Sequence, residues 1–283
     1  MTTGEPNTTS TEAASFHSID HVFGLRRSGH HAVIEWLKDC YAASDEKPIH
    51  VNSVFNRHLS FAQNWPDPTP EDIVEAGVGS TALLVSYEDV DYDERRSSPV
   101  FSTFQTPDYG DAIRETIVVR DWYNFVASRL KFQANCWSID KLDGLVFGLE
   151  WSEVEKRWLR YADVAFNGGN DESRVIAVNY NSWFSDSEYR DQLATQYGLT
   201  NASSSLDIVP DFGTGSSFDG LTLQGKGRQM NVLNRWENLD PELLERYTRL
   251  ISNPQLGEIN RELFGIDQDT VLESVATRLA QSD

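Results

Sequence analysis

The 283-residue chain is poor in cysteine and in long apolar runs. Its two cysteines, Cys40 and Cys136, form no CxxC pair and no histidine or acidic residues stand at metal-ligand spacing, so we expect free thiols and no metal. No apolar run approaches the roughly 18 residues of a membrane span, and the N-terminus lacks the basic and apolar regions of a signal peptide. We therefore expect a cytoplasmic protein without a membrane span.

Positive charge is also scarce. The chain has 24 Lys and Arg residues against 44 Asp and Glu, a formal net charge of -20, and only six of the positive residues are lysine. We expect no nucleic-acid partner, because a phosphate backbone requires a basic surface. The acidic excess is typical of a solvated surface, including one adapted to a salty cytoplasm that screens repulsion. An anion site must then come from a local cluster of Arg, Lys and backbone N–H groups.

Five short β-like runs alternate with amphipathic helical segments. The β-like runs cover 21–25, 49–54, 82–87, 116–120 and 175–180, and the helical segments cover 30–41, 121–132, 151–166 and 241–251. This alternation predicts one α/β domain over 19–283, with a mostly parallel central sheet flanked by helices, after a disordered tail over 1–18. In such sheets, ligands bind beyond the carboxyl ends of the strands.

The stretch FGLRRSGHHAVIEWL lies between the first strand and the first helix. Its glycines have the spacing of a phosphate-binding P-loop, but His30 and His31 stand where that loop has Lys and then Ser or Thr. Backbone N–H groups at the helix start predict an anion site, whereas the missing lysine and magnesium ligand disfavour ATP or GTP cleavage. The alternative is an ordinary strand-turn-helix with surface arginines. The candidate anion ligands are Arg26, Arg27, Ser28, Gly29, His30 and His31.

Two further segments gather positive charge. In TIVVRDWYNFVASRLKF, Arg120 ends a strand and Ser128 follows about two helical turns later, on a stripe with Asn124 and Lys131. This stripe predicts a second anion site, and the alternative is a solvated helix face. The long Gly- and Ser-rich segment 201–229 is predicted to be a functional loop. Its end, LQGKGRQ, could close over a bound anion with Lys226, Gly227 and Arg228.

In this order, the positive segments resemble the PAPS-dependent sulfotransferases of the P-loop sulfotransferase superfamily. RRSGHH is similar to the family's 5′-phosphosulfate loop, with Arg27 at its basic position, although the two histidines replace the usual threonines. VVRDWYNFVAS resembles the 3′-phosphate loop, with Arg120 and Ser128 eight residues apart. VIAVNYNSWF looks like the segment that places a residue near the adenine, here Tyr180, and GKG resembles the late loop over the 3′-phosphate.

The resemblance covers most of residues 20–265 and implies a P-loop nucleotide-kinase-like fold. It also implies metal-independent transfer of a sulfuryl group from PAPS, as co-substrate, to a hydroxyl or amine of a small-molecule, glycan or lipid acceptor. Arg27 is the candidate cation for the leaving phosphate, because an arginine keeps its charge and can bind two oxygens. A nucleotide-dependent kinase or NTPase and a non-catalytic nucleotide-binding protein are the alternatives.

Two residues are candidates for the general base. Glu88 ends the third β-like run, and a buried Glu88 with a raised pKa could take an acceptor proton. The alternative for Glu88 is an exposed carboxylate in an acidic stretch. His50, in the second β-like run, is the rival, and its alternative is a structural histidine.

The acceptor pocket is expected from variable loops, which the sequence places at 53–80, 90–112 and 132–150. Three aromatic residues outside the helical apolar faces could also line it, namely Trp65, Trp183 and Phe184.

Overall fold

The computed structural model describes residues 16–52, 54, 67–136, 149–167, 175–200, 206–211 and 215–281. Of the expected N-terminal tail, residues 1–15 lie outside this part of the chain. The expected boundary at residue 18 is wrong, because the first strand already begins at Phe16, whose side chain is fully buried. Phe16 and Ile19, both fully buried, anchor the strand in the core ahead of the run at 21–25.

Within the described residues, five parallel strands form one central sheet in the order β2-β3-β1-β4-β5. The strands are β1 (Phe16–Gly24), β2 (Pro48–Val51), β3 (Ala82–Glu88), β4 (Gly110–Val119) and β5 (Val175–Asn179). The predicted α/β class and the parallel sheet are therefore confirmed. Because β1 lies between β3 and β4, the loop that follows Gly24 is flanked by the carboxyl ends of both strands, and Gly24 pairs in register with Glu88 and Val118.

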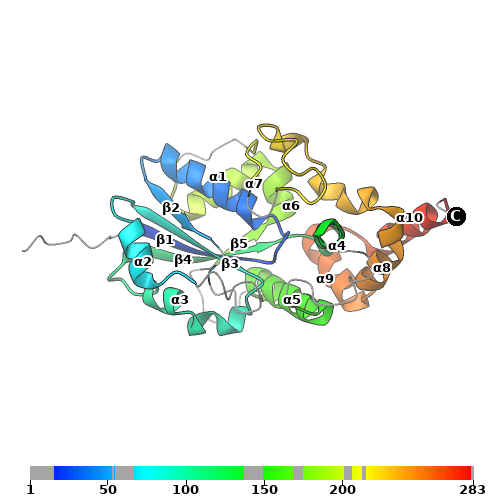
Figure 1. Ribbon diagram of the computed structural model, residues 1–283, viewed down its shortest axis with the longest axis horizontal. Helices are drawn as coiled ribbons and strands as arrows, with labels where there is room; N and C mark the ends of the chain where they lie inside the picture. Colours follow the sequence, from blue (N-terminus) through cyan, green and yellow to red (C-terminus); the bar gives the residue numbers. More distant parts are fainter. Residues whose placement is uncertain are drawn as a thin grey trace, which may run out of the picture.

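Helices cover both faces of the sheet (Figure 1). The α-helices are α1 (His30–Ala43), α2 (Pro70–Ala76), α3 (Pro99–Thr103), α4 (Trp122–Cys136), α5 (Trp151–Asn167), α6 (Tyr180–Ser185), α7 (Ser187–Gln196), α8 (Pro241–Ile251), α9 (Pro254–Phe264) and α10 (Gln268–Ala280). The 3-10 helices are η2 (Tyr92–Ser97), η5 (Gly227–Gln229) and η6 (Val232–Asn238). Asp121 caps α4, since its carboxylate accepts from the Asn124 N–H at 2.9 Å.

The core is divided by the sheet into two clusters. Along β1, Ile19 and Phe23 pack on the side of α3 and α5, whereas Val22 packs on the side of α1 and α6. This alternation follows the two-residue period of a strand, and both faces are apolar because both are covered. Cys40 is buried and Cys136 is exposed, and both are thiols outside any disulfide, as predicted.

Candidate functional site

A tight turn over residues 25–29 joins β1 to α1. The Ser28 N–H donates to the Leu25 carbonyl at 2.9 Å, and the left-handed φ angles of Arg27 and Gly29 are 73° and 89°. Only glycine fits at position 29, because a Cβ atom there would overlap the Tyr180 ring. At position 27 a left-handed arginine costs about 1 kcal/mol, and contacts of its side chain offset this cost.

The two arginines of the turn point to opposite sides of β1. Arg26 Nε donates to Glu88 Oε2 at 3.1 Å, on the β3 side. Arg27 Nε donates to Ser217 Oγ at 2.7 Å, and Arg27 Nη2 donates to the Gly215 carbonyl at 2.7 Å. The turn therefore contributes to two neighbouring polar clusters, and the charge of Glu88 also acts on Arg27, whose pKa it raises against the effect of burial.

The first cluster, which we call the arginine cluster, consists of Arg27, Arg120 and Arg235 with Ser28 and Ser128. Arg120 Nη1 donates to Ser128 Oγ at 3.0 Å and to the Arg27 carbonyl at 3.3 Å. Burial, and then the charges of Arg120 and Arg235, lower the pKa of Arg27 to about 10, so that its guanidinium stays charged at neutral pH. Burial also lowers the pKa of Arg120. Three positive groups this close together favour an anion between them.

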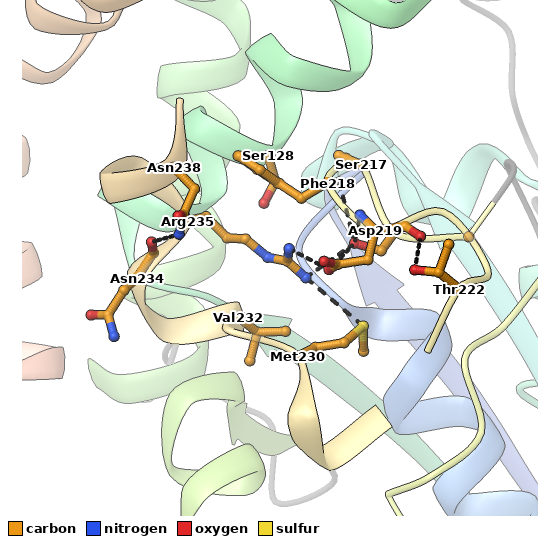
Figure 2. Close-up of polar contacts among 12 residues, drawn as sticks. Ser128, Ser217, Phe218, Asp219, Thr222, Met230, Val232, Asn234, Arg235 and Asn238 are labelled. Carbon is orange, nitrogen blue, oxygen red and sulfur yellow. Dashed lines mark hydrogen bonds and ion pairs between the residues drawn. The ribbon is translucent and has the colours of Figure 1, made fainter. Parts of the chain in front are cut away.

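Arg235 comes from η6 and is absent from the sequence-based candidates. Its Nη1 donates to Asp219 Oδ2 at 2.7 Å (Figure 2), and its Nη2 donates to Ser216 Oγ at 3.1 Å. Its backbone N–H is held by the Asn124 side chain, so α4 positions both Ser128 and Arg235. No sequence motif marks Arg235, because it reaches the cluster only through the packing of η6 on α4.

Ser28 supplies a donor that has no partner in the described part of the chain. Its Oγ is buried and makes no hydrogen bond there. An unpaired buried hydroxyl costs free energy, about 1–3 kcal/mol. A bound anion at the start of α1 would satisfy it, together with the N-terminal N–H groups of the helix.

An aromatic pocket adjoins the arginine cluster. Tyr180 connects the two, since its ring packs on Gly29 and lies 5.2 Å from the Arg120 guanidinium. Met230, on the other side, has its sulfur 3.9 Å from Arg235 Nη2. The pocket is lined by Ala32, Glu35, Trp36, Asp39, Tyr180, Trp183, Phe184, Leu206, Ile208 and Met230. Its lining is mostly aromatic and apolar, with Glu35 and Asp39 as its charged members.

The second cluster, which we call the histidine–glutamate cluster, consists of His30, His31 and Glu88. His31 Nε2 lies 3.0 Å from Glu88 Oε1 in a hydrogen bond, and His30 Nε2 lies 3.3 Å from the same oxygen. His50 is a neighbour, with its ring centroid 6.1 Å from that of His31. Both histidines are therefore directed at Glu88, at the end of β3. They were expected to be anion ligands beside Arg27, and the structure places them in the other cluster instead.

The pKa shifts change the expectations for the general base. Burial alone would raise the pKa of Glu88, but the imidazoles of His30 and His31 and the charge of Arg26 outweigh burial and hold it well below its usual range. The expected raised pKa of Glu88 is therefore wrong, because the carboxylate is buried among partners that stabilise its ionised form. Burial and the charge of His31 lower the pKa of His50 to about 3, and its Nε2 lies 3.1 Å from Ser86 Oγ.

A buried ion pair between Arg129 and Asp89 holds the turn in place. Arg129 of α4 donates to both carboxylate oxygens of Asp89 at 2.8 and 2.9 Å, and to the Arg26 carbonyl at 3.3 Å. Asp89 in turn accepts from the Arg26 N–H at 3.0 Å. The fork of an arginine fits a carboxylate in this two-bond geometry, which fixes the turn relative to β3 and α4.

The other predicted anion ligands lie elsewhere. Lys131 pairs with Asp240 at 2.6 Å instead of facing an anion. Lys226 and Arg228 are exposed, and the charge of Arg228 contributes to lowering the pKa of Arg190 on α7, after burial. Gly227 is packed so tightly that a Cβ atom would overlap the Leu206 carbonyl. Closure of this loop over the arginine cluster stays a prediction.

The expected acceptor loops are described only in part. Residues 53, 55–66 and 137–148, and with them Trp65, lie outside the described residues. Much of 90–112 forms η2, α3 and the start of β4, and Tyr92, Phe101 and Phe104 are buried in the core. This segment therefore packs as core, because its aromatic residues cover the sheet. Trp183 and Phe184 do line a pocket, beside Tyr180.

No protein-family model matches the chain, and no curated protein is significantly similar to it. Within the described residues, none of the helices combines the length and the apolar character needed to cross a membrane.

Proposed function

We propose that this chain is a sulfotransferase that transfers a sulfuryl group from PAPS to a hydroxyl or amine acceptor. The observation that carries the proposal is the arginine cluster at the carboxyl ends of β1 and β4, in a chain of net charge -20. Burial removes water from these guanidinium groups and their charges repel one another, and a bound polyanion would offset both costs.

The cluster fits a nucleotide with anions at two positions. The turn, with Arg27, Ser28 and the start of α1, is suited to the 5′-phosphosulfate, and the Arg120–Ser128 pair is suited to the 3′-phosphate. The aromatic pocket beside Tyr180 is suited to the adenine. The three parts are contiguous, because Tyr180 contacts both the turn and Arg120.

The geometry also favours a donor that needs no magnesium. His30 takes the place of the P-loop lysine, and its ring is packed against Gly24, where a Cβ atom would overlap it. His31 takes the place of the Ser or Thr that would bind Mg²⁺, and it is directed to Glu88. Neither residue presents a cationic amine or a hydroxyl to the phosphates of ATP or GTP.

In the proposed reaction, the acceptor oxygen or nitrogen attacks sulfur while the bond from sulfur to the 5′-phosphate oxygen breaks. Adenosine 3′,5′-bisphosphate leaves, its new charge stabilised by Arg27, and the acceptor proton passes to a base on the β3 side of the turn. Glu88 and His50 are the candidates there, and the lowered pKa of each makes it a weak base. Stabilisation of the leaving group therefore carries the larger share of the catalysis.

Thermal unfolding in the presence of nucleotides tests the proposal. Adenosine 3′,5′-bisphosphate at about 100 times its Kd should add about 2.7 kcal/mol of stability, which raises Tm by about 5 °C or more, with EDTA present. Arg27→Ala and Arg120→Ala should abolish the shift. Arg160→Ala, which removes an arginine from an exposed pair with Asp93, is the matched control and should keep it.

Three outcomes separate the alternatives. A shift with Mg-ATP but none with the bisphosphate would refute the proposal in favour of a kinase or NTPase. A bisphosphate shift without transfer of labelled sulfate from PAPS to any hydroxyl or amine in an acceptor panel would indicate a non-catalytic nucleotide-binding protein. A shift together with transfer supports the proposal.

A further inference from the structure

The histidine–glutamate cluster has a geometry that hydrogen bonding alone does not explain. His31 is hydrogen bonded to Glu88 Oε1 at 3.0 Å, but His30 Nε2 approaches the same oxygen at 3.3 Å without forming a hydrogen bond. His30 is 1% exposed, and its Nε2 has no hydrogen-bond partner in the described residues. Two imidazoles are therefore directed at one carboxylate oxygen, and one of them is unsatisfied.

We propose that His30, His31 and Glu88 form a binding site for one divalent transition-metal ion, with Zn²⁺ as the best-fitting member of that class. His30 and His31 would bind through Nε2 and Glu88 through Oε1. These three atoms all lie within 4.8 Å of one another. Two imidazoles and one carboxylate are a donor set that suits zinc and its neighbours, and not magnesium or calcium.

The distances agree with this assignment. Ligand atoms about 2.0–2.1 Å from a tetrahedral zinc are about 3.3 Å apart. The two nitrogen–oxygen distances to Glu88 Oε1 are 3.0 and 3.3 Å, so an ion could enter with small shifts of the side chains. Its entry would also satisfy the buried Nε2 of His30.

The surroundings support the ligands. Arg26 Nε donates to Oε2 of Glu88 at 3.1 Å, which orients the carboxylate and leaves Oε1 for an ion. Three protein ligands leave a fourth position for water or a hydroxyl group, whose pKa a bound zinc would lower.

Metal titration of the purified full-length chain tests the site, with Co²⁺ as the spectroscopic probe and Zn²⁺ as the competitor. After removal of metal with a chelator, Co²⁺ should produce visible d–d absorption bands that saturate at about one equivalent, and Zn²⁺ should abolish them. His31→Asn and Glu88→Gln should each weaken binding by at least about 100-fold, since even residues behind the ligands contribute 10–100-fold. Glu88→Gln keeps the shape of the side chain, so a folded variant is expected even where His30→Asn does not fold.

The matched control is His17→Asn. His17 is an exposed histidine that lies 3.4 Å from the Glu46 carboxylate, so it is a histidine–carboxylate pair outside the cluster. This variant should bind Co²⁺ as the unmodified chain does. Absence of saturable binding, or binding that Glu88→Gln and His31→Asn leave unchanged, would overturn the metal site. The inference does not rest on the proposed sulfuryl transfer, because the bisphosphate shift is measured in EDTA and the cobalt spectrum is measured without nucleotide.

Discussion

Replacing Arg235 should separate a binding role from a structural one. Arg235 and Asp219 form one ion pair at 2.7 Å, in which the Arg235 side chain is 6% exposed and that of Asp219 is 29% exposed. Arg235→Gln and Asp219→Asn both break this pair. If Arg235 only supports the fold, the two substitutions should change nucleotide affinity in the same direction. If Arg235 acts on a bound anion, they should change it in opposite directions.

The expected magnitudes follow from the charges. A guanidinium about 8 Å from a phosphate, at an effective dielectric constant of about 20, contributes about 2 kcal/mol. Arg235→Gln should therefore raise the Kd for adenosine 3′,5′-bisphosphate by about 30-fold. Asp219→Asn removes a repulsive charge that solvent screens in part, so a gain of about 1 kcal/mol, or about 5-fold tighter binding, is expected.

Isothermal titration calorimetry at low ionic strength would measure both values, because added salt weakens these terms. Urea unfolding of the same two variants would show similar losses of stability, of about 1 kcal/mol or less, for the shared pair. Equal affinities for both variants and the unmodified chain, or weaker binding in both, would refute the role of Arg235 at an anion site.

Three other predictions concern the support of the turn and the core. Gly29→Ala should abolish the bisphosphate shift and lower stability by more than about 1 kcal/mol, because the residue has a φ of 89° and its Cβ atom would overlap Tyr180; adding Tyr180→Ala should restore part of the stability in urea unfolding. Arg129→Met should lower the free energy of unfolding, measured in urea, by about 3–5 kcal/mol, because it leaves the buried Asp89 carboxylate without its ion-pair partner. A loss below about 1 kcal/mol would contradict this account. Burial lowers the pKa of His21 from 6.5 to about 3, so the unfolded chain takes up the proton first. Between pH 7.5 and 5.5, His21 alone should contribute about 1.4 kcal/mol to the fall in the free energy of unfolding. His21→Leu should lack that part of the pH dependence, and an unchanged slope would count against it.

The sequence predicts most of the sheet and the part of the site that lies in continuous motifs. Apolar runs between amphipathic helices identify all five strands of the described sheet, because a parallel sheet covered on both faces has a simple pattern. Arg120 and Ser128 are eight residues apart at a strand end, and they meet at 3.0 Å. This contact could be predicted because both residues belong to one continuous segment, in which the number of residues between them fixes their separation.

Contacts between distant segments could not be predicted in this way. Arg235 and Arg27 are far apart in the sequence, and they approach each other only because η6 packs on α4. His31 and Glu88 are separated by 57 residues, and they meet because Glu88 ends the strand beside β1. The ionised state of Glu88 could not be predicted either, since the sequence indicates that a carboxylate ends the strand but does not identify its partners.

Arg26 and Arg27 are adjacent in the chain and face different clusters. Insertion or deletion of one residue in this turn would displace both arginines, so that the contact of Arg26 with Glu88 and that of Arg27 with Ser217 could not both be kept. The length of the turn is therefore constrained along with its two glycines, Gly24 and Gly29, at which a Cβ atom would overlap a neighbouring side chain.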